Sequence, residues 1–85
     1  MIEMGDLTMA ALAPGTRALV QSLEAKGLLR RRLLDLGLVP GTVVAAIGRS
    51  PAGDPTAYRI RGAVMALRMD VARQIRVLPI PDSAD

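Results

Sequence analysis

The sequence predicts a mostly β protein, a small barrel of about five strands with one inserted α-helix at residues 28–36 and a short helix near residues 70–74. Three observations support this fold class. The 85 residues supply one hydrophobic core. Short segments alternate apolar and polar side chains with the two-residue period of a strand. Turn-forming residues separate these segments. Closure of five strands into a barrel would remove the exposed edge of an open sheet.

The first two strands follow the same kind of turn. Leu-Ala-Pro-Gly-Thr occupies residues 12–16 and Leu-Val-Pro-Gly-Thr occupies residues 38–42. Proline presets the first turn position, and Gly15 or Gly41 accepts the positive φ that a type II turn requires next. We therefore expect strands after both turns. The second strand is apolar on both faces up to Gly48, which indicates a central position in the sheet.

The inserted helix lies between these strands, at residues 28–36. Leu29, Leu33 and Leu36 have the i, i+4, i+7 spacing of one buried stripe. Gly37 suits the left-handed residue that ends a helix, and Leu38 can then fold back over the last turn.

The third and fourth strands form a predicted hairpin. Residues 56–61 place Tyr58 and Ile60 on one face and arginines on the other, the pattern of a half-buried strand. Gly62 permits a tight reversal into the strand at residues 64–68.

The last two elements close the domain. Asp70 is expected to cap the short helix by accepting its first backbone N–H groups. A final strand begins at Ile75 and is expected to stop near Leu78, because Pro79 lacks a backbone donor. The barrel then covers residues 7–78 of one domain, with short tails at 1–6 and 79–85.

The composition excludes several classes of function. The chain has no Cys, His, Phe or Trp, and Tyr58 is the only aromatic residue. A disulfide scaffold, a zinc knuckle and a thiol enzyme are therefore excluded. No segment approaches the ~20 apolar residues of a membrane-spanning helix. The N-terminus is acidic where a signal peptide would be basic, so we expect a cytoplasmic protein.

The carboxylates do not indicate an active site. Four of the eight lie within six residues of a terminus, and the others are widely spaced: Glu24, Asp35, Asp54 and Asp70. Without histidine, the commonest general base and the commonest transition-metal ligand are missing. We expect no enzyme, no cofactor and no tight metal site, and weak Fe(II) or other divalent metal binding through oxygen ligands stays an alternative.

Two segments are candidate partner-binding sites. On the helix, Arg30 and Arg31 flank Leu34 on the side away from the buried stripe, a combination found at interface hot spots. The simpler interpretation is a solvated arginine face. The second segment is the Pro- and Gly-rich loop before the third strand, which is either a hairpin tip or a rigid docking loop. Its candidate contact residues are Pro51, Gly53, Asp54 and Pro55.

The net charge of +3, with ten of eleven cations arginine, leaves nucleic-acid binding as an alternative. Small barrels that bind single strands stack bases on aromatic side chains, and a groove for proline-rich peptides also needs aromatic walls. One tyrosine cannot supply either surface, so no nucleic-acid partner is expected.

Several short motifs occur in a fixed order: Pro14-Gly15-Thr16, Arg32-Leu33-Leu34-Asp35-Leu36-Gly37-Leu38, Pro40-Gly41-Thr42, Pro51-Ala52-Gly53-Asp54-Pro55, Gly62, Ala66-Leu67-Arg68, and Ala72 with Ile75 and Val77. Their order and spacing resemble the FeoA family, ferrous iron transport protein A, over about residues 7–78. Ala63 and Val64 depart from the larger or polar groups common in that family, which predicts an exposed apolar spot at Val64.

The resemblance implies an SH3-like barrel that serves the ferrous iron transporter FeoB as a cytosolic accessory or regulatory partner, without catalytic residues. It further implies that the chain meets the membrane only through that partner. Docking on the cytoplasmic part of FeoB is therefore the leading hypothesis, and homo-oligomers are an additional possibility.

Overall fold

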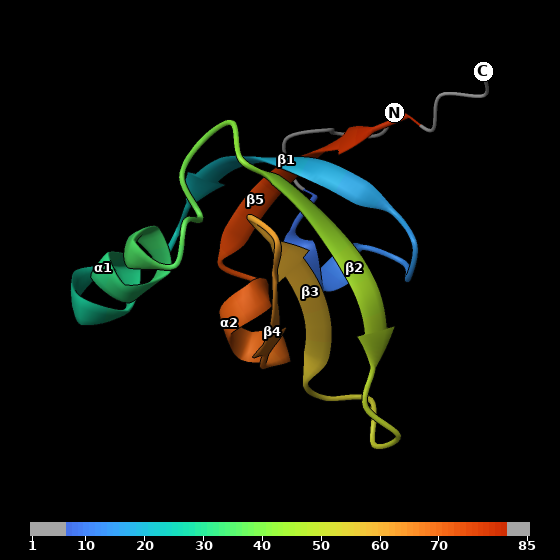
Figure 1. Ribbon diagram of the computed structural model, residues 1–85. Helices are drawn as coiled ribbons and strands as arrows, with labels where there is room; N and C mark the ends of the chain where they lie inside the picture. Colours follow the sequence, from blue (N-terminus) through green and yellow to red (C-terminus); the bar gives the residue numbers. More distant parts are fainter. Residues whose placement is uncertain (1–6, 82–85) are drawn as a thin grey trace.

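The structure is a computed structural model that describes residues 7–81. Figure 1 shows one antiparallel sheet that bends around a single core, with strand order β4-β3-β2-β1-β5. The elements are η2 (Met9–Ala11), β1 (Arg17–Leu23), α1 (Gly27–Asp35), β2 (Val43–Arg49), β3 (Thr56–Ile60), β4 (Ala63–Leu67), α2 (Met69–Ala72) and β5 (Ile75–Ile80). The predicted mostly β class, with one inserted and one short helix, is confirmed.

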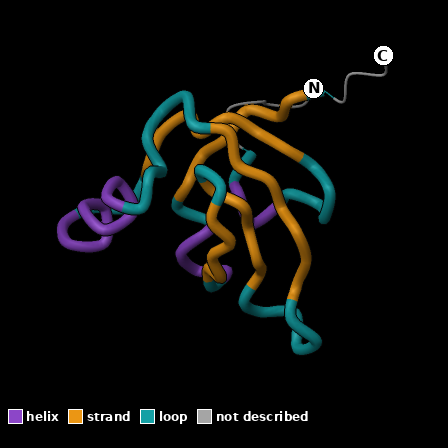
Figure 2. Tube along the Cα trace, in the orientation of Figure 1, coloured by secondary structure: helices purple, strands orange, loops and turns teal. Residues whose placement is uncertain are grey.

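The two helices have different places in the fold. Figure 2 shows α1 standing to one side of the sheet, within the long connection between β1 and β2. The short α2 connects β4 to β5, the two outer strands of the sheet. The sheet and α2 therefore surround the core, while most of α1 projects away from it.

The strand β2 is central, as its two apolar faces predicted. Only one face is buried, however. Val44 and Ala46 point into the core, whereas Val43 and Ile47 are 44% and 41% exposed on the outside. The turns before β1 and β2 form as expected, with positive φ at Gly15 and Gly41.

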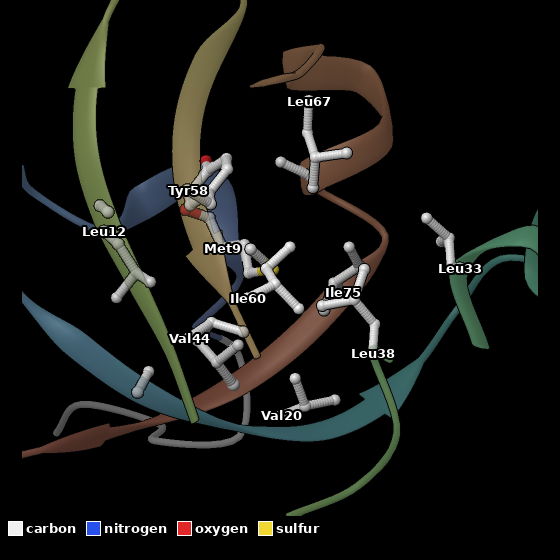
Figure 3. Close-up of a cluster of buried hydrophobic side chains, with 14 of the residues drawn as sticks. Met9, Leu12, Val20, Leu33, Leu38, Val44, Tyr58, Ile60, Leu67 and Ile75 are labelled. Atoms are coloured by element: carbon white, nitrogen blue, oxygen red, sulfur yellow. The ribbon is translucent and has the colours of Figure 1, made fainter. Parts of the chain in front are cut away.

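The core is built mainly from aliphatic side chains around one aromatic ring (Figure 3). Its largest fully buried members are Tyr58, Met9, Leu33, Leu38, Ile60, Ile75, Val44 and Val77. Met9 belongs to the 3-10 helix η2, in a segment without a recognisable period. The Tyr58 hydroxyl donates to the Met9 carbonyl over 3.0 Å, so the only aromatic residue also fixes the N-terminal segment to the sheet.

The end of α1 turns the chain back into the core. Gly37 has φ +102° and donates its N–H to the Leu34 carbonyl, and the Leu38 N–H donates to the Leu33 carbonyl, both over 3.0 Å. This pair of bonds is a Schellman motif. Leu38 is fully buried, as expected, but Leu36 is 40% exposed. The prediction of Leu36 in the buried stripe was wrong, because the helix ends at Asp35 and Leu38 fills that place.

The hairpin between β3 and β4 contacts this helix end. Arg61 and Gly62 form the predicted tight reversal with φ of +51° and +84°. The aliphatic part of Arg61 lies over Gly37, so that a Cβ added at Gly37 would clash with Arg61 Cδ. The absence of a side chain at residue 37 therefore lets the hairpin approach α1.

The cap of α2 differs from the prediction. Arg68 is the N-cap residue, and Asp70 lies inside the helix. The Met69 N–H instead donates to Asp54 Oδ1 in the loop between β2 and β3, over 2.9 Å. The prediction for Asp70 was wrong because a carboxylate distant in sequence takes the capping role.

The strand β5 is longer than predicted and continues through Pro79 to Ile80, which pairs with Arg17. The expected stop near Leu78 was wrong. Because β5 is the last strand of the ladder, its only long neighbour is β1, and an edge position tolerates a residue that cannot donate.

Substitution of Gly37 by valine is expected to destabilise the fold by about 2–3 kcal/mol, because a β-branched residue is strained at this φ. The new side chain would also displace Arg61. Urea unfolding measures the free energy of unfolding of Gly37→Val and of the control variant Gly48→Ala. Gly48 has an ordinary φ and no atom within 4 Å of an added Cβ, so equal losses in both variants would contradict this role of Gly37.

Burial raises the pKa of Tyr58 above its ordinary value of 10.0, despite an opposing hydrogen bond with Thr56. Well below pH 10 both folded and unfolded chains keep the proton. At higher pH the unfolded chain ionises first, so the free energy of unfolding falls by up to about 1.4 kcal/mol per pH unit.

The Tyr58→Phe variant should lose this alkaline slope and, at neutral pH, about 1–2 kcal/mol of stability, because the Met9 carbonyl loses its donor. Ultraviolet absorbance of the single tyrosine reports the titration directly. A wild-type tyrosine that ionises at the same pH in folded and unfolded chains would refute the assignment.

Removal of the Asp54 carboxylate is expected to cost about 1 kcal/mol, the usual value of a helix cap. Thermal unfolding of Asp54→Ala and Asp70→Ala compares the observed and the sequence-predicted cap. Asp70→Ala should lose clearly less stability than Asp54→Ala. A larger loss in Asp70→Ala would show that Asp70 caps α2 in solution.

Candidate partner-binding site

The outward half of α1 brings together the three helix residues that the sequence identified. Arg30, Arg31 and Leu34 line one hollow of about 390 Å³ with Gly27 and Asp35. Both arginines are exposed, and Leu34 is half-buried between them. The hollow therefore offers an apolar floor with two cations and one carboxylate at its rim.

The helix is held to the barrel by few contacts. Leu33 is its only buried residue, and Leu29 packs partly against the core. Arg30 also donates a long hydrogen bond, of 3.4 Å, from Nη1 to the Leu23 carbonyl at the end of β1. A nine-residue helix is marginal by itself, so these contacts and the buried Leu38 after it hold α1 in place.

Leu28 is a further residue of this surface, which was not among those predicted from the sequence. Its side chain is 67% exposed, more than that of any other large hydrophobic residue described. On a helix, Leu28 lies beside Arg31 and Arg32, three and four residues later. A helical wheel could have found it, because Leu28 is about 120° from the centre of the stripe formed by Leu29 and Leu33. We define the α1 surface as Leu28, Arg30, Arg31, Leu34 and Asp35.

The second candidate segment does not join the α1 surface. In Figure 1 the loop between β2 and β3 lies at the end of the molecule far from α1. Within this loop the Ser50 N–H donates to the Pro55 carbonyl over 3.0 Å, and the Gly53 N–H donates to Ser50 over 2.8 Å. Pro51 is exposed at the tip, whereas Pro55 is half-buried and Asp54 caps α2.

Two of the four described carboxylates have structural partners. Glu24 forms an ion pair with Arg76, with 2.6 Å between Oε2 and Nε. Asp54 accepts a hydrogen bond from the Met69 N–H at the start of α2. Within residues 7–81, no three acidic, His or Cys residues lie close enough together to hold a metal ion.

No helix within residues 7–81 has the length and apolar composition needed to cross a membrane. A second hollow, of about 280 Å³, lies beside the start of β1 and the end of β5. Its lining is mostly apolar and consists of Leu7, Ala11, Leu12, Ala13, Thr16, Arg17, Pro79 and Ile80. It contains no titratable group except Arg17.

Comparison with known proteins gives a consistent result. The model of the FeoA domain matches residues 7–79. A FeoA protein from Chlorobium tepidum superposes with TM-score 0.83 and 34% identity, covering 92% of this chain and 75% of that chain. The FeoA of Stenotrophomonas maltophilia in complex with zinc, described as an SH3 domain protein, gives TM-score 0.75 and 31% identity over 84% and 88% of the two chains.

One relative is a much larger protein. The Fe(2+) transport protein A/Fe(2+) transporter FeoB fusion protein of Porphyromonas gingivalis is 31% identical over 78 residues. The match covers 92% of this chain but only 9% of the fusion protein. The family match over nearly all described residues and the SH3-like fold lead to one conclusion: this chain belongs to the FeoA family of ferrous iron transport proteins.

Proposed function

We propose that this chain is a non-enzymatic cytoplasmic accessory protein of ferrous iron uptake, which docks through the α1 surface on the cytoplasmic part of a FeoB-like transporter. The observation that carries the proposal is the outward half of α1, where Leu28 is 67% exposed and Leu34 lies half-buried between the exposed Arg30 and Arg31. The fusion relative supports the partner, because FeoA and FeoB parts share one polypeptide there. Ferrous iron is the transporter's cargo in this proposal.

The chemistry of the α1 surface suits a protein partner. Burial of a fully exposed leucine contributes roughly 1.5–3 kcal/mol, and Leu28 is exposed enough to supply much of this. Arg30 and Arg31 can make planar, bidentate bonds with carboxylates around that apolar contact. Asp35 also lines the hollow, four residues after Arg31, and favours a partner with a cation in the matching place.

The loop between β2 and β3 is a second candidate contact of the same protein. Pro51 and Gly53 form its tip, and its internal hydrogen bonds keep it ordered. Because Asp54 caps α2 and the loop is remote from α1, a partner would have to span the molecule to reach both. We therefore assign the primary contact to α1.

Replacement of Leu28 by glutamine should weaken binding to the FeoB cytoplasmic domain at least tenfold, because the most exposed apolar side chain of α1 is lost. Glutamine preserves side-chain length and helix propensity. Isothermal titration calorimetry with the purified domain measures the affinity. Leu34→Gln should also weaken binding, provided that its melting temperature stays close to that of the wild type.

The matched control is Met69→Gln, which makes the same polar change at a 38% exposed residue of α2. It should bind like the wild type. Unchanged affinity of both leucine variants, with folded proteins by circular dichroism, would remove α1 as the docking surface. A complete absence of binding by the wild type would remove the partner itself.

A further inference from the structure

The outer face of the sheet has an ordered pattern that the α1 surface does not include. Cross-strand pairing places five outward residues in one row across all five strands: Ile80, Arg17, Ala45, Arg59 and Val64. A second row, next to the first, contains Leu78, Leu19 and Val43. We call these two rows, together with Ile47, the outer sheet face.

The outer sheet face is cationic and apolar. The five strands contain four arginines and no Asp or Glu. Of the four carboxylates in residues 7–81, Glu24 pairs with Arg76, and the others lie on α1, in the loop before β3 and on α2. Arg17 and Arg59 are both exposed and have no acidic side chain on their strands.

Exposed aliphatic side chains lie among these arginines. Four of the seven large hydrophobic residues exposed in the described chain are on this face: Val43 at 44%, Ile47 at 41%, Val64 at 57% and Leu78 at 36%. Single exposed aliphatic residues need no explanation, but several together beside unpaired arginines indicate a binding surface.

The shape and composition favour a membrane surface over other polyanions. Figure 1 shows β1 and β2 arching over the core, so the outer face is convex and cannot enclose a peptide. Tyr58, the only aromatic residue, is 1% exposed, which leaves no platform for stacking bases. Arginine forks match lipid phosphates, and short aliphatic side chains can enter the headgroup region of a bilayer.

We propose that the outer sheet face binds the surface of an anionic phospholipid membrane directly. Arg17 and Arg59 contact lipid phosphates, while Val43, Ile47 and Val64 lie at the headgroup boundary. This proposal does not rest on the docking function of α1, and it replaces the expectation that the chain meets the membrane only through FeoB. Both surfaces can act together, because they are formed by different elements.

Sedimentation of the full chain with vesicles tests the proposal. The chain should bind vesicles of phosphatidylcholine and phosphatidylglycerol, and bind vesicles of phosphatidylcholine alone much less, with affinity that falls as salt rises. Arg59→Gln should reduce the partition coefficient about fivefold. Val43→Thr, which keeps the β-branched shape and adds a hydroxyl, should also reduce it.

The matched control is Arg73→Gln, which removes the same charge from an exposed residue at the end of α2. It should bind anionic vesicles like the wild type. An equal loss in Arg73→Gln and Arg59→Gln would overturn the proposal, because net charge alone would then explain binding. Absence of binding to anionic vesicles at low salt, or tighter binding to a DNA duplex at equal phosphate concentration, would overturn it as well.

Discussion

The left-handed turn at Gly37 is the constraint on which the rest of this structure depends. At this residue α1 ends, the chain returns to place Leu38 in the core, and the stem of Arg61 crosses from the β3–β4 hairpin. All three require a residue without a side chain. Because Leu33 before the turn and Leu38 after it are both buried, the opposite half of α1 must face solvent, and the orientation of the candidate surface follows from the turn.

The bent sheet encloses a core that has a single aromatic side chain, because segments distant in sequence contribute to its volume. Met9 comes from the N-terminal segment and is held by the hydroxyl of Tyr58, while Asp54 holds the start of α2. These uses of polar groups also shape the surface. Two of the four described carboxylates are bound internally or paired with Arg76, so several arginines stay available to partners.

The candidate site was only partly predictable. Helical spacing correctly placed Arg30, Arg31 and Leu34 on one side of α1, since that geometry is local. The same spacing could also have identified Leu28, which lies about 120° from the stripe of Leu29 and Leu33. The remote location of the loop at residues 51–55, and its use of Asp54 as a cap, depend on contacts between segments that are far apart in sequence.

The sequence by itself determined the strands, the inserted helix, the turns at Gly15, Gly37, Gly41 and Gly62, and the family, because periodicity, turn chemistry and motif order are local properties. Only the tertiary structure decided which carboxylate caps α2, how far β5 extends past Pro79, and which apolar residues stay exposed. Each of these depends on what lies opposite a residue in space: a loop oxygen, a single neighbouring strand, or solvent on the outer side of the sheet.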